Sequence, residues 1–73
     1  MIEVRLFATL RENREKIYFL PAEDFHCGLD IYNYLSIPKE DVSTFLINGF
    51  HRKPEDEVKD NDVLALFPPV GGG

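Results

Sequence analysis

The clearest chemical feature of the sequence is its ending, Gly71-Gly72-Gly73. It comes directly after the apolar segment 63–67 and the pair Pro68-Pro69. Glycine has no Cβ, so three in succession have wide conformational freedom and fit channels too narrow for other residues. We therefore expect the carboxylate of Gly73 to be presented on a flexible tail, where a partner enzyme can activate and load it. The alternative is an ordinary frayed terminus without chemistry.

Size and composition limit the protein to a single small domain. Its 73 residues are 44% hydrophobic, with six Phe and three Tyr, which suffices for one compact core but leaves little for an enclosed active site. The net charge of −5 argues against nucleic acid as a partner, because a binder needs a basic face to neutralise phosphates. No segment approaches the roughly 18–20 apolar residues of a membrane span, so we expect no membrane contact and a cytoplasmic location.

The other reactive side chains are few. Cys27 is the only cysteine, which excludes an internal disulfide and a Cys-based zinc site and fits a reducing compartment. Cys27 could be a reactive thiol, but a lone cysteine near a helix start is more often a small packing residue. His26 and His51 have no third ligand spaced to join them, so we expect no metal site.

Hydrophobic patterns divide most of the chain into strands. Apolar and polar residues alternate over residues 2–7, which is typical of a half-buried strand, and the exception is Phe7, an aromatic side chain on the outward side. The inward residues of this strand are Ile2, Val4 and Leu6. Further apolar runs predict strands at residues 16–20, 44–47, 50–53 and 63–67.

One helix and one tight turn complete the pattern. Asp24 is the expected N-cap of a short helix that begins at residue 25 or 26 and ends at Leu35, before Pro38. The inward positions of this helix are either Leu29, Tyr32 and Leu35 or Ile31 and Leu35. Asn48-Gly49 predicts a hairpin turn, since both residues tolerate positive φ.

The resulting order is strand, strand, helix, strand, strand, strand. It predicts an α+β fold of the β-grasp, ubiquitin-like type: a mixed sheet of about five strands crossed by one short helix. In this fold we expect the first and last strands to lie side by side at the centre and to run parallel, which is permitted because the whole domain connects them. We assign residues 1–69 to the β-grasp domain and residues 70–73 to a flexible C-terminal tail.

A partner-binding surface is expected next to this tail. Ordering four or five tail residues costs roughly 5–8 kcal/mol, at about 1–2 kcal/mol per residue, so a docking surface on the folded body must offset it. Phe7 and Phe67 both face outward on neighbouring strands, and Pro68, Pro69 and Val70 follow directly. These five residues form the candidate partner-binding patch. The alternative is that a loop or the protein's own tail covers the two rings.

Three stretches of the sequence resemble one known family. They are residues 4–12 (VRLFATLRE), Ile47-Asn48-Gly49, and residues 60–73 (DNDVLALFPPVGGG). The sequence is similar over its full length to the MoaD/ThiS-type sulfur carrier proteins, and within them to the small subunit of molybdopterin synthase. The combination of apolar strand, double proline and terminal Gly-Gly is the most specific part of the resemblance.

The resemblance implies a carrier protein rather than an enzyme. An activating enzyme uses ATP to adenylate the carboxylate of Gly73, and a sulfur donor converts the adenylate into a thiocarboxylate. The large subunit of a synthase then receives the tail, including Gly71 and Gly72, and takes the sulfur for molybdopterin (molybdenum or tungsten cofactor) biosynthesis. The carrier binds no cofactor itself and is expected to be a monomer when free.

Several alternatives stay open at this point. Thiamine-pathway carriers also end in Gly-Gly, and His51 stands where small subunits of molybdopterin synthase tend to carry an apolar residue. A ubiquitin-like modifier uses the same activated glycine to form an isopeptide bond with lysine. A plain interaction domain with an inert tail is a third class.

Overall fold

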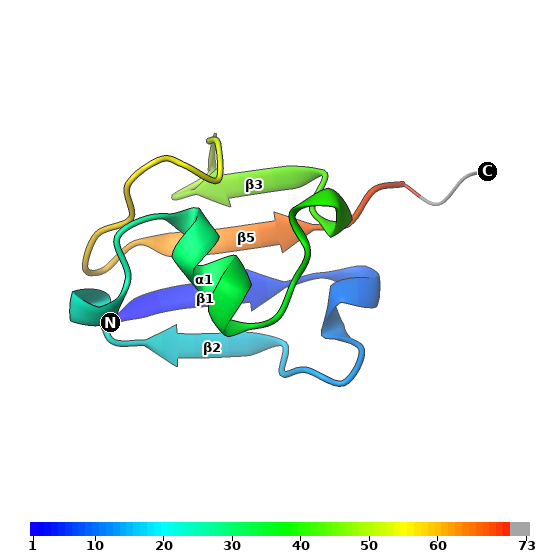
Figure 1. Cartoon of the computed structure of the whole chain (residues 1–73), viewed down its shortest axis with the longest axis horizontal. Coiled ribbons are helices and arrows are strands. Elements are labelled where there is room, and N and C mark those ends of the chain that lie inside the picture. Colours follow the sequence, from blue (N-terminus) through cyan, green and yellow to red (C-terminus); the bar gives the residue numbers. More distant parts are fainter. Residues whose placement is uncertain (71–73) are drawn as a thin grey trace.

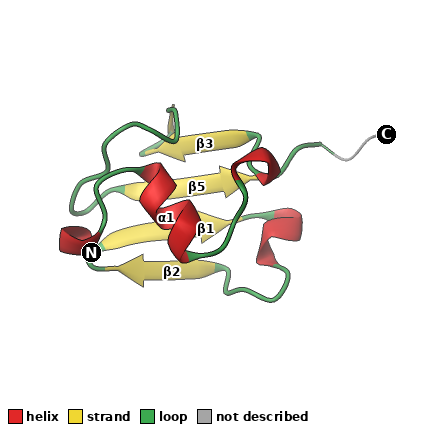
Figure 2. Cartoon of the chain, in the orientation of Figure 1, coloured by secondary structure: helices red, strands yellow, loops and turns green. Residues whose placement is uncertain are grey.

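The computed structural model describes residues 1–70 and shows one mixed sheet crossed by one helix (Figures 1 and 2). The strands and helix are β1 (Ile2–Leu6), β2 (Ile17–Leu20), α1 (Gly28–Tyr34), β3 (Thr44–Ile47), β4 (Phe50–His51) and β5 (Val63–Phe67). Three 3₁₀ turns lie between them: η1 (Ala8–Arg11), η2 (Ala22–Asp24) and η3 (Lys39–Asp41). No helix in this part of the chain is long and apolar enough to cross a membrane.

The strand order is β2-β1-β5-β3-β4, with β1 and β5 adjacent and parallel and the other pairs antiparallel. This arrangement confirms the predicted β-grasp fold, including the two parallel strands at its centre. Val70 is 95% exposed. Residues 71–73, for which a flexible tail was expected, lie outside the described residues.

Alternation along the strands places the core between the sheet and α1. The inward residues of β1 are fully buried, as predicted, and the register pairs Val4 with Leu64 and Leu6 with Leu66 on β5. Phe45 on β3 adds a ring to the same layer, in edge-to-face contact with Tyr32 of α1 at 5.7 Å between centroids. Because residues of equal parity share one face of a sheet, the remaining strand residues form an open face opposite α1.

The helix begins later than expected, at Gly28, and its N-cap is Cys27 rather than Asp24. Asp24 instead lies in η2. The reason is the Asp30 carboxylate, which accepts hydrogen bonds from the backbone N–H groups of His26 (2.8 Å) and Cys27 (3.3 Å) and so fixes the first turn. Cys27 is a half-buried free cysteine.

Close packing explains why glycine starts the helix. A Cβ on Gly28 would lie 2.9 Å from the Phe45 ring and 2.9 Å from the carbonyl oxygen of Pro54. Ile31 and Tyr32 are the buried side chains further along, whereas Leu29 and Leu35 are half-buried against the core. The buried face of α1 therefore combines residues from both predicted sets.

The predicted strand at residues 50–53 is shorter in the structure. β4 contains only Phe50 and His51, although the Arg52 N–H still donates to the Phe45 carbonyl (2.9 Å). The Lys53 N–H turns away to the carboxylate of Asp56 (2.9 Å), and this side-chain bond ends the strand. β1 and β2 also differ by one residue each from the predicted bounds.

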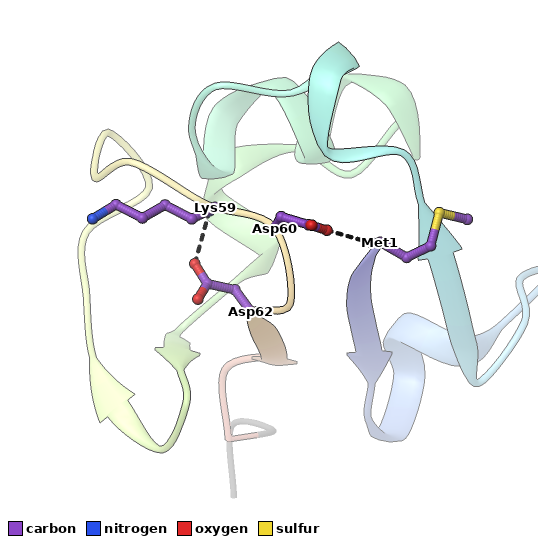
Figure 3. A network of polar contacts seen from close by, with 4 residues as sticks. All are labelled: Met1, Lys59, Asp60 and Asp62. Carbon is purple, nitrogen blue, oxygen red and sulfur yellow. Dashed lines mark hydrogen bonds and ion pairs between the residues drawn. The ribbon is translucent and has the colours of Figure 1, made fainter.

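Two of the stretches that carry the family resemblance meet at the end of the sheet remote from the tail. Asn48 and Gly49 have φ angles of +52° and +85°, as the predicted turn requires. The Asn48 side chain accepts from Val63 N–H (2.9 Å) and donates to Asp62 (2.9 Å), and Asp62 also accepts from Lys59 N–H (2.8 Å; Figure 3). Asn48 therefore joins the β3–β4 turn to the start of β5.

The N-terminus is bound at the same end. The Met1 ammonium group forms an ion pair with Asp60 (Figure 3). The Asn61 N–H donates to the Met1 carbonyl (3.0 Å). The pKa of Asp60 lies below its ordinary value, chiefly because the Met1 ammonium group donates a hydrogen bond to the carboxylate and secondly because that group is positively charged.

Candidate functional site

The candidate site lies where the chain leaves the sheet after β5. β5 lies between β1 and β3, so its C-terminal end emerges from the middle of the sheet (Figure 1). The carbonyl of Phe67 accepts from Ser43 N–H (2.8 Å), and Pro68 and Pro69 then have no N–H with which to continue the ladder. The chain is thus released from the sheet at Pro68.

Phe7 and Phe67 meet at this point. Their rings are stacked, with 4.3 Å between centroids and planes 11° apart, and both side chains are half-buried. The Arg11 guanidinium lies over the Phe7 ring, 5.4 Å from its centroid, while its Nε donates to the Leu6 carbonyl (2.7 Å). The structure therefore brings the two predicted aromatics together, but as a mutually shielding pair partly covered by Arg11.

Phe67 also forms part of the wall of an apolar groove of about 740 Å³ on the open face. Leu46 of β3 and His51 of β4, which are directly opposite in the register, line the same groove. Pro68, Pro69 and Val70 form its border on the tail side. Of the five predicted patch residues, four line this groove, and Phe7 does not.

A second hollow of about 590 Å³ adjoins the same residues 68–70 and has a different chemical character. Its lining includes Glu12, Arg14 and Asp41, so charges of both signs surround it. The guanidinium of Arg14 is already engaged, since it donates to the carbonyls of Leu10, Leu35 and Ser36 at 3.0–3.3 Å. Residues 68–70 thus border an apolar groove and a polar hollow.

Sequence reasoning missed Leu46 and His51 as groove residues. Leu46 could have been found, because alternation along β3 with Phe45 and Ile47 buried puts Leu46 on the open face. His51 depended on the register, which pairs it with Leu46. Its imidazole is exposed at the edge of the sheet.

Residues 1–70 contain no group of three His, Cys, Asp or Glu side chains arranged to hold a metal ion. Within the same range, the site consists of an apolar surface beside the point where the chain leaves β5. It contains no arrangement of reactive side chains among residues 1–70. The glycines that would carry the chemistry, residues 71–73, lie outside the described residues. What the described geometry can do is hold a partner beside the departing chain.

This geometry, with parallel central strands, one crossing helix and an apolar groove beside the exit of the last strand, defines a ubiquitin-like β-grasp protein. The sequence profile of the ThiS family matches residues 4–73, and the chain belongs to that family. The predicted likeness to MoaD/ThiS-type proteins is confirmed. The chain is accordingly a small ubiquitin-like protein of the ThiS family, whose members are generally non-enzymatic carriers.

Two solved structures illustrate the relationship. SAMP1 from Haloferax volcanii is 24% identical, with a TM-score of 0.73 over 99% of this chain and 98% of that one, and supports the fold alone. A complex of subunits 1 and 2 of molybdopterin-converting factor from Helicobacter pylori contains a chain 28% identical, with a TM-score of 0.65 over 99% of this chain and 97% of that one. Among curated proteins, no sequence matches.

Proposed function

We propose that the protein is a cytoplasmic sulfur carrier whose Gly73 carboxylate is activated by an ATP-using partner enzyme and converted to a thiocarboxylate. The observation that carries the proposal is the apolar groove at the chain exit. Phe67, Leu46 and residues 68–70 provide a docking surface directly before the three glycines. A partner held there has the carboxylate of Gly73 within three residues of the groove.

The chemistry follows from the weak electrophilicity of a carboxylate. A Gly73 oxygen attacks the α-phosphate of ATP and expels pyrophosphate, which gives an acyl adenylate with a good leaving group. A persulfide on the donor then attacks the acyl carbon and displaces AMP, which gives an acyl disulfide with the donor. A thiol attacks the donor-side sulfur of this disulfide, so that a new disulfide forms on the donor and the thiocarboxylate leaves. Held on its tether, this nucleophile reacts at a high effective concentration with the acceptor. The partners supply the acids and bases.

We propose the large subunit of a molybdopterin synthase as the sulfur acceptor. The Helicobacter complex supports this choice, because its matching chain is described together with a second subunit of molybdopterin-converting factor. Thiamine biosynthesis is the alternative destination that the family resemblance implies. The step at Gly73 is the same for both.

A ubiquitin-like modifier is the second candidate. In that case a lysine amine, rather than sulfur, displaces the activating group from Gly73 and forms an isopeptide bond. The terminal Gly73 that this reaction requires is present in the sequence, and the Haloferax small archaeal modifier protein has the same fold. Both functions depend on the same activated terminus, so the product distinguishes them.

Mass spectrometry of the protein isolated from its native cell tests the proposal. A thiocarboxylate raises the mass of the C-terminal peptide by about 16 Da, since one sulfur replaces one oxygen. A series of larger conjugates through Gly73 would instead identify a modifier. The matched control lacks Gly73 and should show neither change. An unaltered Gly73 carboxylate, together with no ATP–pyrophosphate exchange by the activating enzyme encoded in the same genome, would contradict the proposal. The C-terminal glycines would then have no chemical function.

A further inference from the structure

The turn at Asn48-Gly49 has a reactivity that the proposed function does not use. It is the only Asn-Gly pair in the sequence, and glycine has no Cβ to shield its backbone nitrogen from the asparagine side chain before it. Both residues are exposed, and a Cβ added to Gly49 would meet no atom of residues 1–70 within 4 Å. Water therefore reaches this turn freely.

Asn48 is bonded to the start of β5 by its backbone and by both ends of its side-chain amide. Its N–H donates to the Val63 carbonyl (2.8 Å), and its Oδ1 accepts from the Val63 N–H (2.9 Å). Its Nδ2 donates to the carboxylate of Asp62 (2.9 Å), whose other oxygen accepts from the Lys59 N–H (Figure 3). Nδ2 is thus the hydrogen donor that joins the side chains of Asn48 and Asp62.

We propose that Asn48 is a site of spontaneous deamidation, that the fold restrains the reaction, and that its product separates the β3–β4 turn from β5. The Gly49 nitrogen attacks Cγ of Asn48 and loses its proton, and Nδ2 leaves as ammonia, so that a five-membered imide forms. Water then opens the imide at one of its two carbonyls. Attack on the side-chain carbonyl gives aspartate, and attack on the backbone carbonyl gives isoaspartate.

The fold restrains this reaction through the backbone of the turn. Asn48 and Gly49 both have positive φ angles, as a two-residue hairpin loop requires. The imide ring is nearly planar, and its closure requires a ψ angle at Asn48 far from the value in such a turn. The turn must therefore open before the ring closes, and opening breaks the bonds to Val63 and Asp62. In the folded protein, the rate of deamidation thus depends on how often this end of the sheet opens.

Aspartate at position 48 lacks the donor that joins this residue to Asp62. Aspartate tolerates positive φ as asparagine does, and its carboxylate still accepts from the Val63 N–H. Its second oxygen, however, faces the carboxylate of Asp62 across the former hydrogen bond, and two neighbouring carboxylates disfavour being charged together. Isoaspartate adds a methylene group to the main chain and so lengthens the loop between the paired residues Ile47 and Phe50. Since the groove lies at the other end of β5, this inference does not depend on the proposed function.

Peptide mass spectrometry of the full chain, incubated in mildly alkaline buffer either folded or unfolded in urea, tests the reaction. The peptide that contains Asn48 should gain about 1 Da, since ammonia leaves and water enters, and should do so roughly tenfold faster or more in the unfolded chain. Asn13, which precedes the bulkier Arg14, is the internal control and should react far more slowly. Asp62→Ala should speed the reaction of the folded protein by roughly fivefold, because one restraining hydrogen bond is lost. No gain in the unfolded chain, equal rates in the two states, or an unaltered rate in folded Asp62→Ala would overturn the proposal.

Thermal unfolding of substituted chains tests the effect of the product. Asn48→Asp reproduces one product directly and should lower the melting temperature at neutral pH by about 5 °C or more. The loss should shrink as the pH falls, because one of the two carboxyl groups then takes up a proton and donates it in a hydrogen bond to the other. The other charged residues that line the same hollow are common to all the variants: Arg52, Asp56, Glu57 and Lys59.

Two further variants separate the contact with Asp62 from a general effect of charge. Combining Asn48→Asp with Asp62→Asn places a donor opposite an acceptor again and should recover most of the lost melting temperature. Asn13→Asp is the matched control and should lose little, because Asn13 is exposed, also has a positive φ (+60°), and gains the same charge. An unchanged melting temperature in Asn48→Asp, an equal loss in Asn13→Asp, or no recovery in the double variant would contradict the contact. If Asn48→Asp does not fold, the melting temperature of the double variant decides the point.

Discussion

Replacing Phe67 by Ala removes a groove wall and half of the aromatic stack with Phe7. Truncating a fully buried Phe costs about 3–5 kcal/mol, so a half-buried ring should cost roughly half, about 1.5–2.5 kcal/mol of unfolding free energy. The stack accounts for about 0.5–1.5 kcal/mol of this. For a domain of this size, the melting temperature should fall by roughly 6–20 °C, while the protein stays folded at 25 °C.

Phe67 and Phe7 should differ in how much each contributes to partner binding. Phe67 lines the groove, so Phe67→Ala should weaken binding to the activating enzyme by about 1–3 kcal/mol, or roughly five- to 150-fold in Kd. Phe7 lies outside the groove lining and acts by supporting the Phe67 ring. Phe7→Ala should therefore cost similar stability but only about 1 kcal/mol in docking, roughly fivefold in Kd.

Calorimetric titration of each folded variant with the activating enzyme, beside thermal unfolding, measures both quantities. The double variant should show coupling between Phe7 and Phe67, since either single change already breaks the stack. Phe50→Ala is the control, because Phe50 is an exposed aromatic that does not line the groove. Binding that survives Phe67→Ala unchanged, or that falls equally with Phe50→Ala, would refute the assignment of the groove.

Three further predictions concern the tail, the helix start and the core. Gly72→Ala should keep the melting temperature of the protein but lose most sulfur transfer in a reconstituted assay, because a Cβ would obstruct a narrow channel in the partner. Gly71→Ala should have a much milder effect in the same assay. Equal activity of the two variants would argue against close contact between the partner and the tail. Gly28→Ala should lower stability in denaturant titrations by about 1–3 kcal/mol, since its Cβ would lie 2.9 Å from the Phe45 ring; a gain in stability would show that the ring moves aside freely. Burial, with a smaller effect of a nearby glutamate, raises the pKa of Tyr32 to about 12 from 10.0, so the folded state keeps a proton that the unfolded state loses, and stability should decline between pH 10 and 12. Tyr32→Phe should flatten this decline in unfolding curves recorded across that range, and an identical decline in both proteins would assign it to other groups.

Much of the fold followed from local patterns. Alternation placed Ile2, Val4 and Leu6 in the core because strand geometry fixes the side-chain period at two. Asn48-Gly49 located its turn because few dipeptides adopt two successive positive φ angles. These features depend on residues close together in the sequence. The start of the helix was missed because the Asp30 side chain and the space beside Phe45 select it, rather than the first available cap residue.

The sequence by itself determined the order of strands and helix along the chain, the inward faces of the strands, and the presence of three glycines after an apolar strand and two prolines. Outward parity alone also placed Phe7 and Phe67 on the same face. Only the tertiary structure decided that Phe67 lines the groove while Phe7 does not, and that His51 joins it from β4. The reason is physical: a groove is formed by side chains from strands far apart in the chain, and its members depend on the register between strands, which no single strand encodes.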